Sequence, residues 1–207
     1  MTKAAHSLFL AIFLAAAPAT YAADESPLPQ IGAPLEKYPV VRAEFIQTKQ
    51  MTALKRPLVT SGHLVFSRSQ GVLWQIEQPY QAAYILGEDS IVEIAADASR
   101  RVRTLREVPG LAQVGRVFRS MLGANTAALR NYFEAVTKGD AARWEMRLTP
   151  KQPQLAQFLK GLQLQGGLFV ESIQIEENGG DLTRIQFKHS QGSAALTPAE
   201  QKIFSGE

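Results

Sequence analysis

The 207-residue sequence contains no cysteine and only three histidines. Without disulfide bonds, the folded chain must be held together by burial of apolar side chains. Bacterial lipoproteins carry their lipid on a cysteine, so this chain is not itself lipid-modified in that way. His63 and His189 each stand alone on an expected strand, which argues against a histidine metal centre or a nucleophile paired with histidine.

Sequence motifs of common enzyme classes are missing as well. Residues 110–115 lack the Lys-Ser/Thr pair of a phosphate-binding loop, and no Gly-x-Ser-x-Gly turn occurs in the chain. Most acidic residues alternate with apolar ones, as on the solvated face of a strand. We therefore expect no catalytic residue, no metal and no cofactor, and a role other than catalysis.

The sequence has little excess of either charge, with 22 Lys and Arg against 19 Asp and Glu. This balance does not favour nucleic acid as a partner. The one local excess is the segment 100–106, which contains four arginines. Two interpretations remain open for this segment. It is either a solvated edge strand whose charges prevent aggregation, or a surface that docks onto an acidic partner or phospholipid headgroups.

Long hydrophobic runs are absent except near the N-terminus, where Leu8 to Ala17 form an apolar stretch after Lys3 and His6. This stretch is too short to span a bilayer, and Thr20 and Ala22 supply the two small residues that signal peptidase reads. We expect residues 1–22 to be a cleavable signal peptide for export to the periplasm, with an uncleaved membrane anchor as the alternative. Residues 23–207 contain no evident linker and are expected to form a single domain.

The most informative segment is 62–79, where apolar residues recur at every second position on both sides of a short turn. This period of two predicts a β-hairpin with one apolar face, and the Gly-containing loop 69–71 suits its turn. Arg68 stands directly before that loop. In a sandwich the apolar face would be covered by an opposing sheet, whereas in a half-closed barrel it would line a cavity for a hydrophobic ligand. The apolar residues of the hairpin are Leu64, Phe66, Val72, Trp74 and Ile76.

The alternation along the rest of the chain predicts about nine to eleven antiparallel strands and few helices. Trp144 to Pro150 alternate most cleanly. Apolar residues at three- and four-residue spacings predict a helix over 111–122 and a shorter helical stripe over 155–162, while the capping box at 197–200 predicts one helical turn. So many strands are expected to curl into an unclosed antiparallel β-barrel or half-barrel, a mainly β fold that helices cover.

Several short motifs occur in a defined order along this pattern. In the first half they are Phe45-x-Gln47, Gly62-x-Leu64, Arg68, Trp74 and Gln78-Pro79. In the second half they are Leu122-Gly123, Tyr132-Phe133, Trp144-x-x-x-Leu148-x-Pro150 and Leu182-Thr183-Arg184-Ile185. Together they resemble the LolA family of periplasmic lipoprotein carriers over about residues 38–190, which is most of the chain.

The resemblance implies an unclosed barrel with a helical lid over an apolar cavity. It also implies a monomer that receives lipid-modified proteins from an inner-membrane ABC complex and hands their acyl chains to an outer-membrane LolB-like receptor. By position, Arg68 matches the family arginine that hydrogen-bonds to backbone carbonyls of the lid and holds the empty cavity shut. The candidate cavity residues are Phe45, Leu64, Phe66, Val72, Trp74, Ile76, Trp144 and Met146, and the candidate lid residues are Val114, Val117, Phe118 and Met121.

Two departures from the family pattern leave the cargo open. Ser69 follows Arg68 where the family usually has proline, and Glu93 stands about where an aromatic residue is common. One alternative is therefore a carrier or accessory for another acylated product of an exporter. A second alternative is a periplasmic sensor module on the same fold, which would bind lipidated or misfolded chains without moving them.

Overall fold

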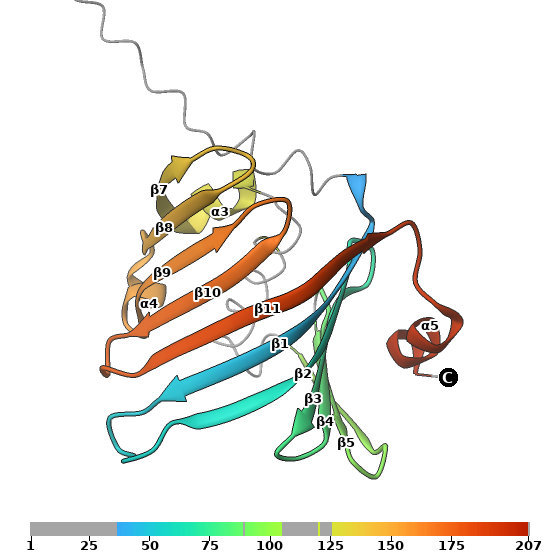
Figure 1. Ribbon diagram of the computed structural model, residues 1–207. Helices are drawn as coiled ribbons and strands as arrows, with labels where there is room; N and C mark the ends of the chain where they lie inside the picture. Colours follow the sequence, from blue (N-terminus) through green and yellow to red (C-terminus); the bar gives the residue numbers. More distant parts are fainter. Residues whose placement is uncertain (1–36, 89, 105–119, 121–125, 207) are drawn as a thin grey trace, which may run out of the picture.

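One antiparallel sheet of eleven strands accounts for most of the described chain (Figure 1). The computed structural model describes residues 37–88, 90–104, 120 and 126–206. Neighbouring strands follow the order β6-β5-β4-β3-β2-β1-β11-β10-β9-β8-β7. Every neighbouring pair except β1 with β11 is consecutive in sequence, so the β1–β11 pair joins two halves that are each built from local hairpins.

Strands β1 to β6 form the half that we call the first wing. Their bounds are β1 (Val40–Gln50), β2 (Leu58–Ser67), β3 (Gly71–Gln78), β4 (Ala82–Leu86), β5 (Ser90–Ala95) and β6 (Arg100–Thr104). The predicted hairpin is the β2–β3 pair, and Gly71 at its turn has a φ of 100°, a conformation that glycine adopts without strain.

Strands β7 to β11 form the second wing. Their bounds are β7 (Phe133–Gly139), β8 (Trp144–Pro150), β9 (Leu159–Gly166), β10 (Val170–Glu177) and β11 (Leu182–Ser193). Three helices complete the described chain: α3 (Thr126–Tyr132), α4 (Pro153–Ala156) and α5 (Pro198–Ser205). None of these described helices is long and apolar enough to cross a membrane.

The sheet is curved and does not close on itself. Figure 1 shows the second wing face-on and strands β3 to β5 nearly edge-on, so the two wings enclose a concave side. Strands β6 and β7 stand at the two ends of the strand order, and within the described residues they do not pair with each other. The predicted class, a mainly β fold with an unclosed antiparallel sheet, is confirmed.

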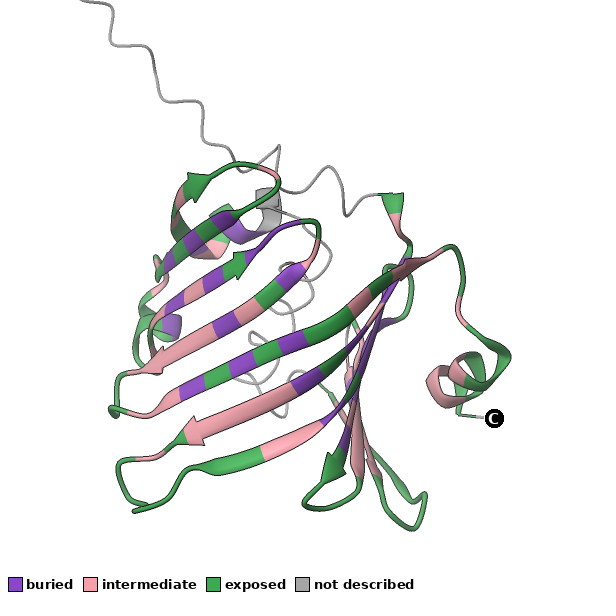
Figure 2. Cartoon of the chain, in the orientation of Figure 1, coloured by how far each residue is buried: buried purple, intermediate pink, exposed green. Residues whose placement is uncertain are grey.

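The main hydrophobic core lies on the concave side, which we call the inner face. Because side chains alternate across a strand, buried and exposed residues alternate along β8 and β11 (Figure 2). Helices α3 and α4 add Leu129 and Leu155 to this core. Its largest fully buried side chains include Phe45, Phe133, Leu64, Leu148, Leu164 and Ile173.

A second, smaller core lies on the opposite, outer face of the first wing. It consists of Val40, Val65, Leu73 and Ile85, with Leu196, Ile203 and Phe204 from the C-terminal segment packed against it. Helix α5 therefore covers this part of the outer face, and Figure 1 shows it beside the first wing on the convex side.

Polar contacts hold α5 against the sheet. The guanidinium of Arg42 on β1 donates from Nε and Nη2 to the two carboxylate oxygens of Glu200, each at 2.6 Å. The Nη2 of Arg100 on β6 donates to the carbonyl oxygen of Ile203 at 3.0 Å. Thr197 and Glu200 form the predicted capping box at the start of the helix, and the helix has eight residues rather than one turn.

Two sequence predictions about local structure are wrong. The hairpin does not have a single apolar face, because Val65 and Leu73 are buried on the face opposite Leu64 and Trp74. The segment 155–162 is not one helix. A single helical turn ends at Ala156, and the following leucines belong to β9, which pairs with β8 on one side and β10 on the other.

The strand predicted from Trp144 to Pro150 is confirmed with the same bounds. Its inward residues alternate with polar ones that face solvent. The helix predicted over 111–122 and its lid residues Val114, Val117, Phe118 and Met121 lie outside the described residues.

Candidate functional site

An aromatic cluster joins the two wings on the inner face. The rings of Phe45 and Trp74 are stacked, with centroids 3.8 Å apart and an interplanar angle of 29°. Phe187 meets Trp74 edge-on at a centroid distance of 6.3 Å. Since Phe45, Trp74 and Phe187 come from β1, β3 and β11, the cluster spans the line along which the wings meet.

On the second wing, Trp144 is held by a close fit to two glycines. A Cβ atom on Gly166 would lie 2.7 Å from the indole ring and 2.3 Å from the carbonyl oxygen of Phe169, so only glycine leaves room for the ring. The indole Nε1 donates to the carbonyl oxygen of Gly167 at 2.8 Å. This hydrogen bond satisfies the one polar atom of a side chain that is otherwise in the apolar core.

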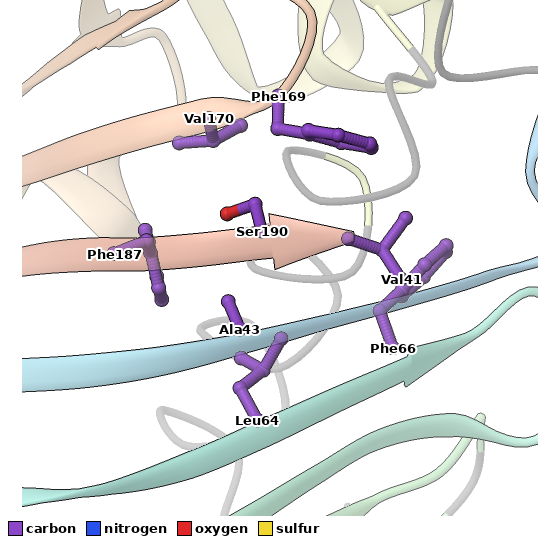
Figure 3. Close-up of a pocket in the computed structure, with 8 residues that line it drawn as sticks. All are labelled: Val41, Ala43, Leu64, Phe66, Phe169, Val170, Phe187 and Ser190. Carbon is purple, nitrogen blue, oxygen red and sulfur yellow. The ribbon is translucent and has the colours of Figure 1, made fainter. Parts of the chain in front are cut away.

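A small pocket opens between the wings near this cluster (Figure 3). Its free volume is about 10 Å³, room for roughly one water molecule, so an acyl chain enters only if the lining side chains move apart. The lining is apolar apart from the hydroxyl of Ser190. The lining residues are Val41, Ala43, Leu64, Phe66, Phe169, Val170, Phe187 and Ser190.

All eight residues predicted to line the cavity lie in the inner-face core, and each is at most 9% exposed. Leu64 and Phe66 also line the small pocket. The other six, Phe45, Val72, Trp74, Ile76, Trp144 and Met146, are packed in the core without lining that pocket. The prediction that they contact an acyl chain remains a prediction.

Sequence reasoning missed several residues of this site. Phe187, Val41 and Ala43 line the pocket, and their alternation with polar neighbours on strands was a usable signal. Phe169 precedes β10 and Val170 is its first residue, and no periodicity marks either of them. They join the site because β10 pairs with β11 in the second wing.

The family model that matches the sequence is described as outer membrane lipoprotein carrier protein LolA-like, and it covers residues 15–201. The match therefore takes in both wings and the first turn of α5. The chain belongs to this LolA-like family. Comparison with curated proteins gives no match.

Several solved structures resemble the LolA-like sheet at low identity. The LolA superfamily protein NE2245 from Nitrosomonas europaea has 9% identity and a TM-score of 0.48, over 86% of this chain and 95% of that one. A putative outer membrane lipoprotein-sorting protein domain from Vibrio parahaemolyticus has 8% identity and a TM-score of 0.46, over 86% and 96%. The Pseudomonas aeruginosa MucA/MucB complex gives 11% identity and a TM-score of 0.43, over 84% and 58%.

Arg68, the residue predicted to act as a latch, lies in the turn between β2 and β3 and is exposed. Its backbone N–H donates to the carbonyl oxygen of Pro39 at 2.9 Å, which ties this turn to the start of β1. The family lid falls outside the described residues, so the predicted latch remains a prediction.

One titratable group on the inner face of this LolA-like sheet has a shifted pKa among the described residues. Burial, helped by the nearby charge of Glu93, raises the pKa of the Tyr84 phenol above its ordinary value. The two histidines in the described part of the chain pair with glutamates at exposed positions: His63 with Glu77 at 2.8 Å and His189 with Glu44 at 3.1 Å. Across the described ranges, no group of three or more His, Asp or Glu residues could hold a metal ion.

Proposed function

We propose that this protein is a soluble periplasmic carrier that shields the acyl chains of lipid-modified proteins and ferries them from the inner to the outer membrane. The observation that carries the proposal is the continuous apolar inner face of an unclosed sheet in a member of the LolA-like family. This face runs from β3 in the first wing to Phe133 at the start of β7 in the second. The proposed role is binding and transfer, with no catalytic step.

The energetics of acyl burial limit how such a carrier works. Burial stabilises by about 0.8 kcal/mol per CH₂ group, so one fully sequestered long chain would gain on the order of 10 kcal/mol and several would exceed the practical affinity limit of roughly 20. A carrier that bound so tightly would not release its cargo. Opening of the narrow pocket costs free energy and lowers the net affinity, which makes release to a more hydrophobic receptor favourable.

The proposed partners follow from this cycle. An inner-membrane ABC complex would supply the energy that extracts the lipid-modified protein from its membrane. A LolB-like receptor would take it at the outer membrane because its apolar site binds the acyl chains more tightly. The carrier itself would contact each membrane complex only transiently.

Native mass spectrometry of protein purified from periplasm tests the proposal. The expected result is an acylated ligand that copurifies with the wild type. Replacement Ala43→Leu adds apolar volume to the pocket wall and is expected to reduce ligand occupancy several-fold. Ala142→Leu makes the same change at an exposed turn position and is expected to leave occupancy unchanged.

Each possible result of the mass spectrometry leads to a different conclusion about the cargo. A lipid-modified protein on the wild type supports the lipoprotein carrier. A bound lipid without a protein part points to the carrier of another acylated product. Absence of any acylated ligand, in preparations whose folding is verified by circular dichroism, overturns the proposed function.

The latch assignment has its own test. We expect Arg68→Leu to weaken the closed empty state, so that cargo is retained and its transfer to a receptor slows several-fold. The guanidinium is needed because its planar set of donors can serve several carbonyls at once. Arg147→Leu, at an exposed position on β8, is the matched control. Normal transfer by Arg68→Leu would refute the latch and leave the carrier proposal standing.

A further inference from the structure

The strand register of the first wing connects the apolar pocket to the edge strand β6. Directly opposed residues in antiparallel strands point to the same face of the sheet. One inner-face row runs through Val41, Phe66, Val72, Leu86, Ile91 and Arg103. The adjacent row runs through Ala43, Leu64, Trp74, Tyr84, Glu93 and Arg101. Both rows begin with residues that line the pocket and end with an arginine.

The three arginines of β6 differ in the face of the sheet on which they lie and in their hydrogen-bond partners. Arg100 lies on the outer face, where its guanidinium donates to the carbonyl oxygen of Ile203 in α5. Arg101 and Arg103 point to the inner face, and within the described part of the chain neither forms an ion pair or a side-chain hydrogen bond. Arg101 is exposed and Arg103 is half-buried. Among the described residues, neither guanidinium group thus has a side-chain partner that would compete with an anion.

The charges around Arg101 and Arg103 favour the binding of an anion. Glu93 is the one acidic side chain in the two rows, directly opposite Arg101, so the inner-face edge keeps a net positive charge. A guanidinium group offers several N–H donors in one plane and binds phosphate through two parallel hydrogen bonds. The phenol of Tyr84 lies between Trp74 and Glu93 in the same row, and its O–H can add a further donor.

We propose that Arg101 and Arg103 bind the phosphate headgroup of a phospholipid whose acyl chains lie along the inner face of the sheet. This inference rests on the acyl-binding inner face of the proposed function and goes beyond its lipoprotein cargo, because it assigns the same face a second ligand class, anionic phospholipids. Strand β6 lies four strand spacings from β2, about 19 Å along the sheet. The headgroup would thus stay at the edge of the sheet, in water, while the chains extend from there toward the pocket.

Binding of short-chain lipids below their critical micelle concentration tests this site. Dioctanoyl phosphatidylglycerol carries the anionic phosphate, and dioctanoylglycerol has the same chains without it. We expect the wild type to bind the phospholipid about tenfold more tightly, as one charge-assisted hydrogen bond corresponds to roughly that factor. The measurement is displacement of a fluorescent fatty-acid probe from the full chain.

Two charge-reversal variants isolate the contribution of β6. Arg101→Glu/Arg103→Glu is expected to lose the preference for the phospholipid and to keep the wild-type affinity for dioctanoylglycerol. Arg143→Glu/Arg147→Glu makes the same change in net charge at exposed positions of the second wing and is expected to keep the preference. Thermal unfolding of both variants verifies that they are folded.

The outcomes separate the headgroup site from the proposed function. If the wild type binds both lipids equally and the β6 variant changes nothing, the headgroup site is refuted while acyl binding stands. If the wild type binds neither lipid, both fail. If the β6 variant loses only its binding to phosphatidylglycerol vesicles, the arginines dock on a membrane surface and the inference is overturned. Binding of glycerol phosphate alone, as tight as that of the lipid, would also overturn it.

Discussion

The two wings share an apolar inner face but differ on their outer faces. In the first wing, Val65, Leu73 and Ile85 are buried on the outside beneath α5 and its flanking residues. In the second wing, the outward residues of β8 and β11, among them Arg147 and Gln186, are exposed to solvent. One continuous sheet thus combines strands buried on both faces with strands buried on one.

This difference follows from the pattern of apolar residues along the strands of each wing. Val72, Leu73 and Trp74 form an unbroken apolar run, as is usual for strands covered on both sides. Trp144, Met146 and Leu148 alternate with charged residues, as is usual for strands with one solvated face. Among the described residues, the first wing is consequently packed on both faces, and the second wing is packed on its inner face.

The largest expected effect follows from removing a side chain beneath α5. Leu73 is fully buried on the outer face, so Leu73→Ala should lower the free energy of unfolding by about 3 kcal/mol. Arg147→Ala, on the outer face of the second wing, should change it by less than about 0.5 kcal/mol. Urea denaturation measures both. Equal effects would mean that α5 does not create a second core.

The ion pair that holds α5 should give the next largest effect. Glu200→Gln keeps the shape of the side chain and the capping box but removes the charge opposite Arg42. Because the Glu200 side chain is only 14% exposed, we expect a loss of about 2 kcal/mol. Glu177→Gln, whose pair with Lys49 is more exposed, should cost less than about 1 kcal/mol. The two variants are compared by the same denaturation measurement.

Acid should abolish the contribution of that ion pair. Hydrogen bonds from Arg42, and further ones from Thr197, hold the pKa of Glu200 below its ordinary value. A carboxylate with a lowered folded-state pKa stabilises fully above its unfolded-state pKa, and this stabilisation is lost as the pH falls through the folded-state value. The difference between wild type and Glu200→Gln should therefore be full at neutral pH and shrink steadily below about pH 4.3. A difference that is constant with pH would contradict the assignment.

A smaller effect is expected on the inner face of the second wing. Trp144→Phe keeps most of the apolar volume but removes the hydrogen bond from the indole Nε1 to the carbonyl oxygen of Gly167. We expect a loss of about 1 kcal/mol, measured by thermal unfolding. Met146→Leu, a volume-conserving change on the same strand, serves as the control for repacking. If both variants unfold at the same temperature, the indole hydrogen bond does not contribute to stability, because water donates to the carbonyl oxygen of Gly167 in the Trp144→Phe variant.

The sequence predicted the architecture where its periodicity was unambiguous. Trp144 to Pro150 alternate without interruption, so the bounds of β8 could be read directly. The C-terminal helix was predictable because Thr197 and Glu200 form a local capping box. The residues of the inner face followed from the same alternation, since the side of a strand that is apolar in sequence is the side that packs.

Other features depend on contacts that no local pattern encodes. The leucines at 159 and 162 fit a helical stripe and also a strand, and pairing of Leu162 with Leu148 and Ile175 decides for the strand. The unbroken apolar run at Leu73 is compatible with an outer-face core, but the segment that covers it, Ile203 and Phe204, is far away in sequence and could not be predicted. The pocket at Ala43 likewise depends on how β1 meets β2 and β11.

The pairing of β1 with β11 has a consequence for biogenesis. These two strands lie at the middle of the sheet, yet they come from opposite ends of the described chain. A growing polypeptide can form the local hairpins of each wing as they emerge, but it cannot join the wings until β11 has been synthesised. Pairing of β11 with β1 thus completes the middle of the sheet, and the two wings remain unjoined until β11 is available.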